Sequence, residues 1–236
     1  MIARVVIAVA AAVLAATVAQ AAEIRVLASG ATREAYIELA PKFELASGHR
    51  LSTTWAGTAE IKKRLAAGDV YDLVIMASYE IDDQIKQGKL VAGSRADLMK
   101  SGVAMAVPRG APKPDIGSVE ALKKAILNAK TVGYSSGPSG VYFLTLIEKL
   151  GIAQDVKPRL KQTPSGVAVG TLLANKEADI GFQQVSELIH FPGIAYVGPL
   201  PAEVQQITTF SAGVHSSARE TVATQALVKF LTGPIA

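Results

Sequence analysis

Residues 24–78 read IRVLASGATREAYIELAPKFELASGHRLSTTWAGTAEIKKRLAAGDVYDLVIMAS. Short apolar runs in this stretch are separated by segments whose apolar residues recur at helical spacing. The expected strands are 24–28, 51–55 and 74–76, and the expected helices are 32–46, 59–67 and 79–87. Strands that alternate with helices through short loops are typical of a mostly parallel sheet covered by helices. The sequence therefore predicts an α/β fold.

The second half of the chain repeats this alternation after a proline-rich break. An apolar run at 103–107 is closed by Pro108, Pro112 and Pro114, and prolines at this density interrupt regular structure. We place a lobe boundary there and expect the chain to return to the first lobe near Ile207. The predicted division is 22–106 plus 208–236 for lobe 1 and 107–207 for lobe 2. Within 107–236 we expect helices at 119–129, 140–150, 167–175 and 218–231, and strands at 131–134, 179–183 and 207–214.

The N-terminal residues 1–21 have the pattern of a secretory signal peptide. Arg4 precedes an almost unbroken run of Ala, Val, Ile and Leu at 5–18, and Ala19-Gln20-Ala21 ends in the small-x-small pattern of a cleavage site. A membrane anchor is the alternative, but the run is shorter than the roughly 20 residues that a spanning helix needs. We therefore expect export to the periplasm.

Composition excludes several classes of function. The chain has no cysteine, so thiolate chemistry and Cys-ligated zinc are excluded. Its 24 Lys and Arg against 20 Asp and Glu give a net charge of +4. The basic residues form no run, which argues against nucleic acid as a partner. His49, His190 and His215 share no metal-type spacing, so no metal site is expected. Phosphate-loop and dinucleotide motifs are missing, and no cofactor is expected.

Polar loops follow several of the expected strands. In an open parallel sheet, ligands bind beyond the carboxyl ends of the strands, where the free N–H groups of helix starts attract anions. Ordinary helix capping is the alternative, because Ser and Thr are common caps. Several such loops at one edge of the sheet favour a shared anion site. The candidate ligand-binding residues in these loops are Ser29, Gly30, Gly57, Thr58, Ser78, Ser135, Ser139 and Gly166.

Three further candidates come from the second half. Gln183 and Gln184 end an expected strand, where their amides can donate and accept hydrogen bonds in a cleft or simply form a surface turn. Tyr142 lies one turn into its helix, where its hydroxyl can face the same cleft or its ring can pack. Both alternatives stay open for each residue.

Segments 27–32, 56–61, 71–78, 139–142 and 177–182 together resemble the periplasmic molybdate-binding proteins of ABC transporters. The resemblance implies the two-lobed periplasmic binding protein type II fold, with a two-strand hinge. It also implies an oxyanion held by hydroxyls and backbone N–H groups. Gly30 and Gly57 or Thr58 would line the first lobe, and Ser139, Gly166 and Gln184 the second. Gly30 stands where such proteins usually have serine, and Gln184 where they usually have tyrosine.

Segments 105–107, 110–116 and 181–188 are similar to a branch of this superfamily that includes aconitate isomerase, which needs no cofactor. Two hypotheses follow. The first is a monomeric binding protein that delivers a small anion, either a molybdate-like oxyanion or a di- or tricarboxylate, to an ABC permease. The alternative is an aconitate isomerase, with Arg33 either a carboxylate clamp or an exposed helix residue. No residue is assigned as its catalytic base.

Overall fold

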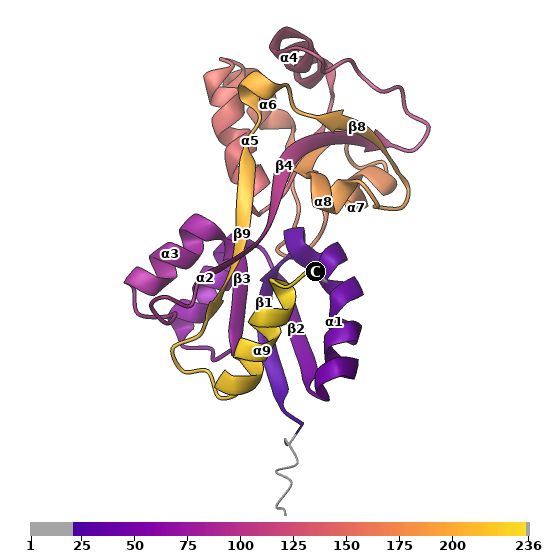
Figure 1. Ribbon diagram of the computed structural model, residues 1–236. Helices are drawn as coiled ribbons and strands as arrows, with labels where there is room; N and C mark the ends of the chain where they lie inside the picture. Colours follow the sequence, from indigo (N-terminus) through magenta and orange to yellow (C-terminus); the bar gives the residue numbers. More distant parts are fainter. Residues whose placement is uncertain (1–20, 235–236) are drawn as a thin grey trace, which may run out of the picture.

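The computed structural model describes residues 21–234, so the expected signal peptide lies almost wholly outside the described residues. The described chain folds into two α/β lobes linked by long strands (Figure 1). Within residues 21–234, nine strands form one hydrogen-bonded sheet: eight follow one another in the order β2-β1-β3-β9-β4-β7-β5-β6, and β8 pairs with β4 beside this path. The two-lobed fold expected from the resemblance is confirmed.

The first lobe has a parallel core of three strands. These are β1 (Glu23–Ser29), β2 (Arg50–Ala56) and β3 (Leu73–Ala77), and β9 (Ile207–Val214) pairs antiparallel with β3. The helices are α1 (Arg33–Ser47), α2 (Thr58–Ala67), α3 (Ser78–Lys86) and α9 (Thr221–Leu231). A short 3₁₀ turn, η1 (Gly30–Thr32), joins β1 to α1. Gly48 and Gly68 end α1 and α2 in the left-handed conformation that glycine adopts without strain.

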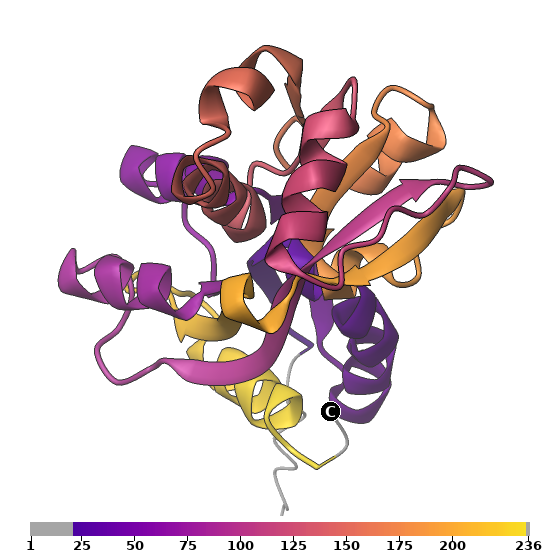
Figure 2. The ribbon, with the colours of Figure 1, turned by 90° about the horizontal axis from the view of Figure 1, so that it is seen from above.

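The second lobe repeats this plan. Its parallel strands are β5 (Val132–Tyr134), β6 (Leu160–Gln162) and β7 (Ile180–Gln184), and β8 (Ile194–Pro199) runs antiparallel to β4 (Ala96–Pro108). The helices are α4 (Val119–Asn128), α5 (Pro138–Lys149), α6 (Ala153–Val156), α7 (Val169–Ala174) and α8 (Val185–Leu188). The 3₁₀ turn η2 (Lys157–Arg159) follows α6, and η3 (Ala202–Val204) follows β8. Seen from above, helices flank the strands on either side (Figure 2).

Strand β4 carries the chain from one lobe to the other. It pairs with β9 from Ala96 to Gly102 and with β7 from Val103, so its partner changes between these two residues. The chain then runs back along β4 in β9, which begins at Ile207. Strand β4 is one extended strand, and Pro108 ends it beside Ile194 of β8. The residue limits of the lobes stay a prediction.

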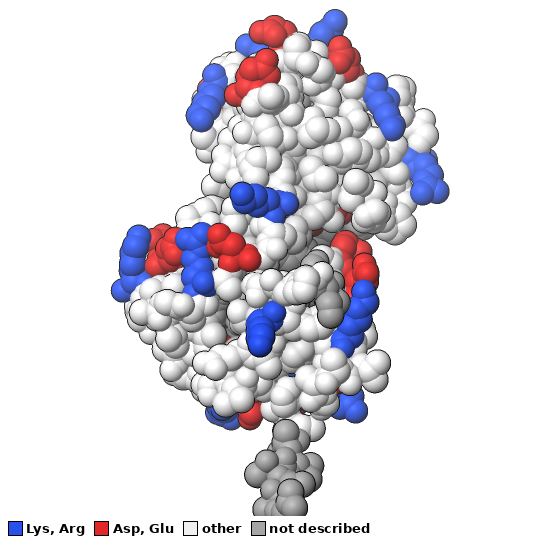
Figure 3. Space-filling model, in the orientation of Figure 1, with Lys and Arg blue, Asp and Glu red and all other residues white. Residues whose placement is uncertain are grey.

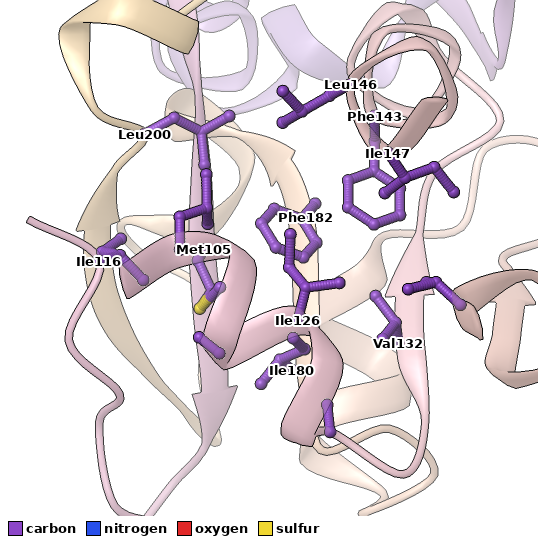
Figure 4. Close-up of a cluster of buried hydrophobic side chains, with 14 of the residues drawn as sticks. Met105, Ile116, Ile126, Val132, Phe143, Leu146, Ile147, Ile180, Phe182 and Leu200 are labelled. Carbon is purple, nitrogen blue, oxygen red and sulfur yellow. The ribbon is translucent and has the colours of Figure 1, made fainter. Parts of the chain in front are cut away.

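Each lobe has its own hydrophobic core. In the second lobe, Phe143 of α5 stacks on Phe182 of β7 with ring centroids 4.4 Å apart, and both side chains are fully buried (Figure 4). In the first lobe, Phe43 packs against Phe230 at 5.5 Å, which joins α1 to α9. Separate cores let each lobe behave as a unit around the strands that link them.

The surface is mixed in charge. Lys, Arg, Asp and Glu side chains are scattered over both lobes on the face in Figure 3, and the molecule narrows between the lobes. In the described part of the chain, no helix combines the length and the apolar character that crossing a membrane would require.

Candidate functional site

A small cavity lies where the two lobes meet. Its volume is ≈ 30 Å³. The first lobe contributes Ser29 and Gly30, from the end of β1, and Ala56 and Gly57, from the turn between β2 and α2. The second lobe contributes the loop before α5, the loop before α7 and the end of β7: Ser135, Ser136, Gly137, Pro138, Gly166, Val167, Gln183 and Glu187.

The structure brings six of the predicted site residues together in this cavity. They come from four expected loops and one strand end: Ser29, Gly30, Gly57, Ser135, Gly166 and Gln183. Loops from both lobes meet there because parallel strands present their carboxyl ends at one edge of each sheet, and the crossing strands turn those two edges toward each other.

The lobes touch each other at the cavity. The backbone N–H of Gly57 donates to Ser165 Oγ at 2.8 Å, and Ser186 Oγ donates to the carbonyl oxygen of Ala31 at 2.8 Å. The approach at Gly57 depends on its missing side chain, because an added Cβ would lie 2.6 Å from Ser136 Oγ. Gly166 has φ +77°, and a Cβ there would lie 3.0 Å from the Trp55 carbonyl oxygen.

Uncharged hydrogen-bonding groups dominate the lining. Ser135 Oγ lies 2.9 Å from Ser139 Oγ and accepts from the Gly137 N–H at 3.2 Å. Helix α2 begins after Gly57 and α5 after Gly137, so the positive ends of two helix dipoles meet at the cavity, one from each lobe. Among the residues that the structure describes, no Lys, Arg or His lines it. Hydroxyl groups and helix starts, and no cationic side chain of the described residues, therefore face this cavity.

Among the described residues that line the cavity, Glu187 is the only Asp, Glu, Lys, Arg or His, and the sequence analysis did not predict it. Gln183 Nε2 donates to Glu187 Oε1 at 2.6 Å, and the Val169 N–H donates to Gln183 Oε1 at 2.7 Å. Burial raises the pKa of Glu187 to about 8, although hydrogen bonds from Gln183 and from the Gln184 backbone pull it down. The available signal was the four-residue spacing from Gln183 across a strand-to-helix junction, which puts the two side chains within reach.

Two predicted hydroxyls lie just behind the lining. Ser139 is buried and contacts the cavity through Ser135. Thr58 is buried in the first turn of α2, next to Gly57, and its Oγ1 has no hydrogen-bond partner within residues 21–234. Thr163, in the second lobe, also has a buried Oγ1 without a hydrogen-bond partner among the described residues. Neither threonine is among the residues that line the cavity.

Three other candidates are not in the cavity wall. Ser78 begins α3, is half-buried and is not among the lining residues. Tyr142 packs, and its hydroxyl donates to the Val204 carbonyl oxygen at 2.5 Å. Gln184 cannot share a face with Gln183 because successive residues of a strand point to opposite sides. It is fully buried at the crossing, where its amide lies 3.3 Å from Thr208 Oγ1 on β9 and reaches the Ser101 and Gly102 carbonyl oxygens of β4 at 3.0 Å.

The described residues hold no cluster of three or more His, Cys, Asp or Glu side chains placed to bind a metal ion. Arg33 is exposed beside the cleft, and its guanidinium lies over the Trp55 ring at 5.4 Å. It is not a lining residue.

Comparison with known proteins fits this geometry. Residues 24–236 match the family model described as bacterial extracellular solute-binding protein. The chain belongs to this family. A curated relative, aconitate isomerase of a Pseudomonas species, is 35% identical over 212 residues, which is 87% of this chain and 80% of the relative.

Molybdate-binding proteins are more distant members of the same group. The molybdate-binding protein ModA of Azotobacter vinelandii is 25% identical over 236 residues, covering 98% of this chain and 92% of the relative. A solved structure of the Azotobacter vinelandii periplasmic molybdate-binding protein superposes with a TM-score of 0.77 at 18% identity, covering 90% of this chain and 94% of that one. This second likeness shows the fold, and the fold is that of the two-lobed binding proteins.

Proposed function

We propose that this family member is a periplasmic binding protein that captures a small anion between its lobes and presents it to an ABC-type permease. The observation that carries the proposal is the cavity at the lobe junction, lined from both sides by uncharged donors and helix starts. Hinge closure around a ligand is the usual working motion of two-lobed binding proteins.

The chemistry of the lining favours an anion over a cation. Hydroxyls and helix N-termini donate hydrogen bonds to negative oxygens and place positive partial charge toward them. The ligand classes that fit are molybdate-like oxyanions and di- or tricarboxylates. A cavity of ≈ 30 Å³ requires the lobes to separate before such an ion enters.

The test is calorimetric titration of the purified protein with molybdate, tungstate, citrate and cis- and trans-aconitate. We expect one of these anions to bind at micromolar concentration and to raise the melting temperature. Ser135→Ala should weaken that binding about tenfold, as expected for about 1.4 kcal/mol of lost hydrogen bonding. The matched control is Ser52→Ala on the exposed edge of β2, which should bind normally. A protein that gives no heat and no melting shift with the whole panel would overturn the proposal.

A second candidate function, isomerisation of aconitate, is favoured by the position of Glu187. An allylic proton shift needs a base that removes a proton from one carbon and returns it to another, a role that Glu187 can take only in its ionised form. Glu187 is the titratable side chain in the cavity lining, and the Pseudomonas relative bears the name of this activity. The reaction needs no oxidant or cofactor because the double bond only changes its position.

Proton NMR of trans-aconitate with the purified protein distinguishes the two candidates. Formation of the cis isomer by the wild-type chain, and its loss in Glu187→Gln, would establish the enzyme. Binding of aconitate without any cis isomer above the buffer background would leave the binding protein alone.

A further inference from the structure

Glu187 presents a chemical problem to the proposed ligand. Its carboxyl group faces a cavity in which none of the described lining residues is a cation. An ionised carboxylate there would repel an incoming anion across a low-dielectric space, where like charges interact strongly. Either Glu187 moves away or it is neutral when the anion binds.

The packing around Glu187 keeps its side chain in place. Gln183 Nε2 donates to Oε1, and the orientation of the Gln183 amide is fixed in turn because its own oxygen accepts from the Val169 N–H. On the opposite side, Gly30 approaches so closely that an added Cβ would lie 3.1 Å from Oε1. Helix α8 also packs directly against η1 of the first lobe. The carboxyl is therefore held between the lobes.

These contacts also determine which oxygen carries a proton. Oε1 accepts the hydrogen bond from Gln183, so in the neutral acid the proton lies on Oε2. A protonated carboxyl is a hydrogen-bond donor, and it adds one more uncharged donor to a lining that already consists of such groups.

We propose that Glu187 acts as a protonated donor to the bound anion, so that the cleft takes up its ligand together with one proton. This inference rests on the proposed anion-binding function and names the residue that regulates it. The Glu187 carboxyl also sets specificity. In its protonated form it accepts ligands that place a hydrogen-bond acceptor next to it, and in its ionised form it repels the same ligands.

Among the described residues, no charged side chain of the elements packed against α8 lines the cavity beside Glu187. The packed elements η1, α7 and β7 have no titratable side chain. None of the titratable groups on the other packed elements lines the cavity or shifts the pKa of Glu187: Arg33, Glu34, Tyr36, Glu38, Lys42 and Glu44 on α1, Asp97 and Lys100 on β4, and Tyr196 on β8. His190, just after α8, is exposed. Burial is the dominant influence, and it places the pKa of Glu187 at about 8.

The experiment is calorimetric titration between pH 7 and 9 with trans-aconitate and, in a second arm, molybdate. In the wild-type protein the dissociation constant should rise about tenfold from pH 7 to 9, because one proton is linked to binding. Titrations in two buffers of different ionisation enthalpy should show about one proton taken up per ligand at pH 9. Glu187→Gln, which is neutral at every pH, should bind with nearly constant affinity and take up no proton.

The matched control is Glu177→Gln, the same charge change at an exposed residue paired with Lys161, and it should retain the wild-type pH dependence. Binding that does not change with pH, or a Glu187→Gln variant that follows the wild-type curve, would overturn the inference and leave the proposed function standing. If neither wild type nor Glu187→Gln binds either anion at any pH, the proposed function fails, and this inference with it.

Discussion

Gly30 and Glu187 face each other across the cleft, at a distance that leaves little room for a side chain at position 30: an added Cβ would lie 3.1 Å from Glu187 Oε1. The resemblance to molybdate-binding proteins identified Gly30 as a departure, since serine is usual there. The structure supplies a physical reason for that departure. The space that a serine side chain would enter is next to a carboxyl group from the opposite lobe.

This relationship predicts the effect of Gly30→Ala. The new methyl group must displace Glu187 or hold the lobes apart, so the affinity for the anion found in the panel should fall about tenfold, equivalent to about 1.4 kcal/mol. Calorimetry measures the change. Gly198→Ala is the control, because a Cβ there would be at an ordinary 3.8 Å from Ile116 Cδ1. Unchanged affinity in Gly30→Ala would show that this contact does not limit closure.

Gly57→Ala tests the other close approach between the lobes. Its Cβ would lie 2.6 Å from Ser136 Oγ, which is closer than real side chains come, so closure should be impaired and ligand binding weakened at least tenfold. Removing the opposing oxygen in the double variant Gly57→Ala/Ser136→Ala should restore part of the affinity. The two single variants and the double variant form a cycle measured by calorimetry. Additive effects would contradict a direct contact.

The pKa of Glu187 predicts how stability depends on pH. Burial raises this pKa from 4.5 to about 8, so between these values the folded protein keeps a proton that the unfolded chain has lost. The free energy of unfolding must therefore fall as pH rises through this window. The melting temperature of the wild-type protein, followed by circular dichroism from pH 5 to 9, should decline. Glu187→Gln should show a smaller decline, and parallel curves for the two proteins would rule out Glu187 as the source.

The stacked pair Phe143 and Phe182 predicts a large loss of stability on truncation. Phe182→Ala removes a fully buried ring from the second-lobe core, which costs about 3–5 kcal/mol. Urea unfolding measures this loss as a lower midpoint. Val141→Ala, on the exposed face of α5, should change the free energy of unfolding by less than about 0.5 kcal/mol. A similar midpoint in both variants would show that the stacked rings are not the basis of this core.

Sequence patterns were sufficient for the elements whose signal is local. The strand expected at 207–214 is β9 to the residue, and the strands expected near 24–28 and 51–55 are β1 and β2 with slightly wider limits. The short strands β6 and β8 were missed, and of β4 only the apolar run at 103–107 was noted. Residues 96–102 read ADLMKSG, a stretch without an apolar run that is extended because it pairs with β9.

In the candidate site, too, local features could be predicted from the sequence and features that depend on distant residues could not. By itself the sequence determined that polar, glycine-containing loops follow the strands at one edge of each lobe, because strand periodicity and loop composition are local properties. It could not separate Gln183, which lines the cavity, from Gln184, which is buried at the crossing, since that choice depends on which face of β7 meets the other lobe. Nor could it identify Glu187, whose environment exists only after β4 and β9 bring the two lobes together. The burial of Glu187, and the pKa that follows from it, depends on neighbours that lie far away along the chain. Only the tertiary structure therefore decided both properties.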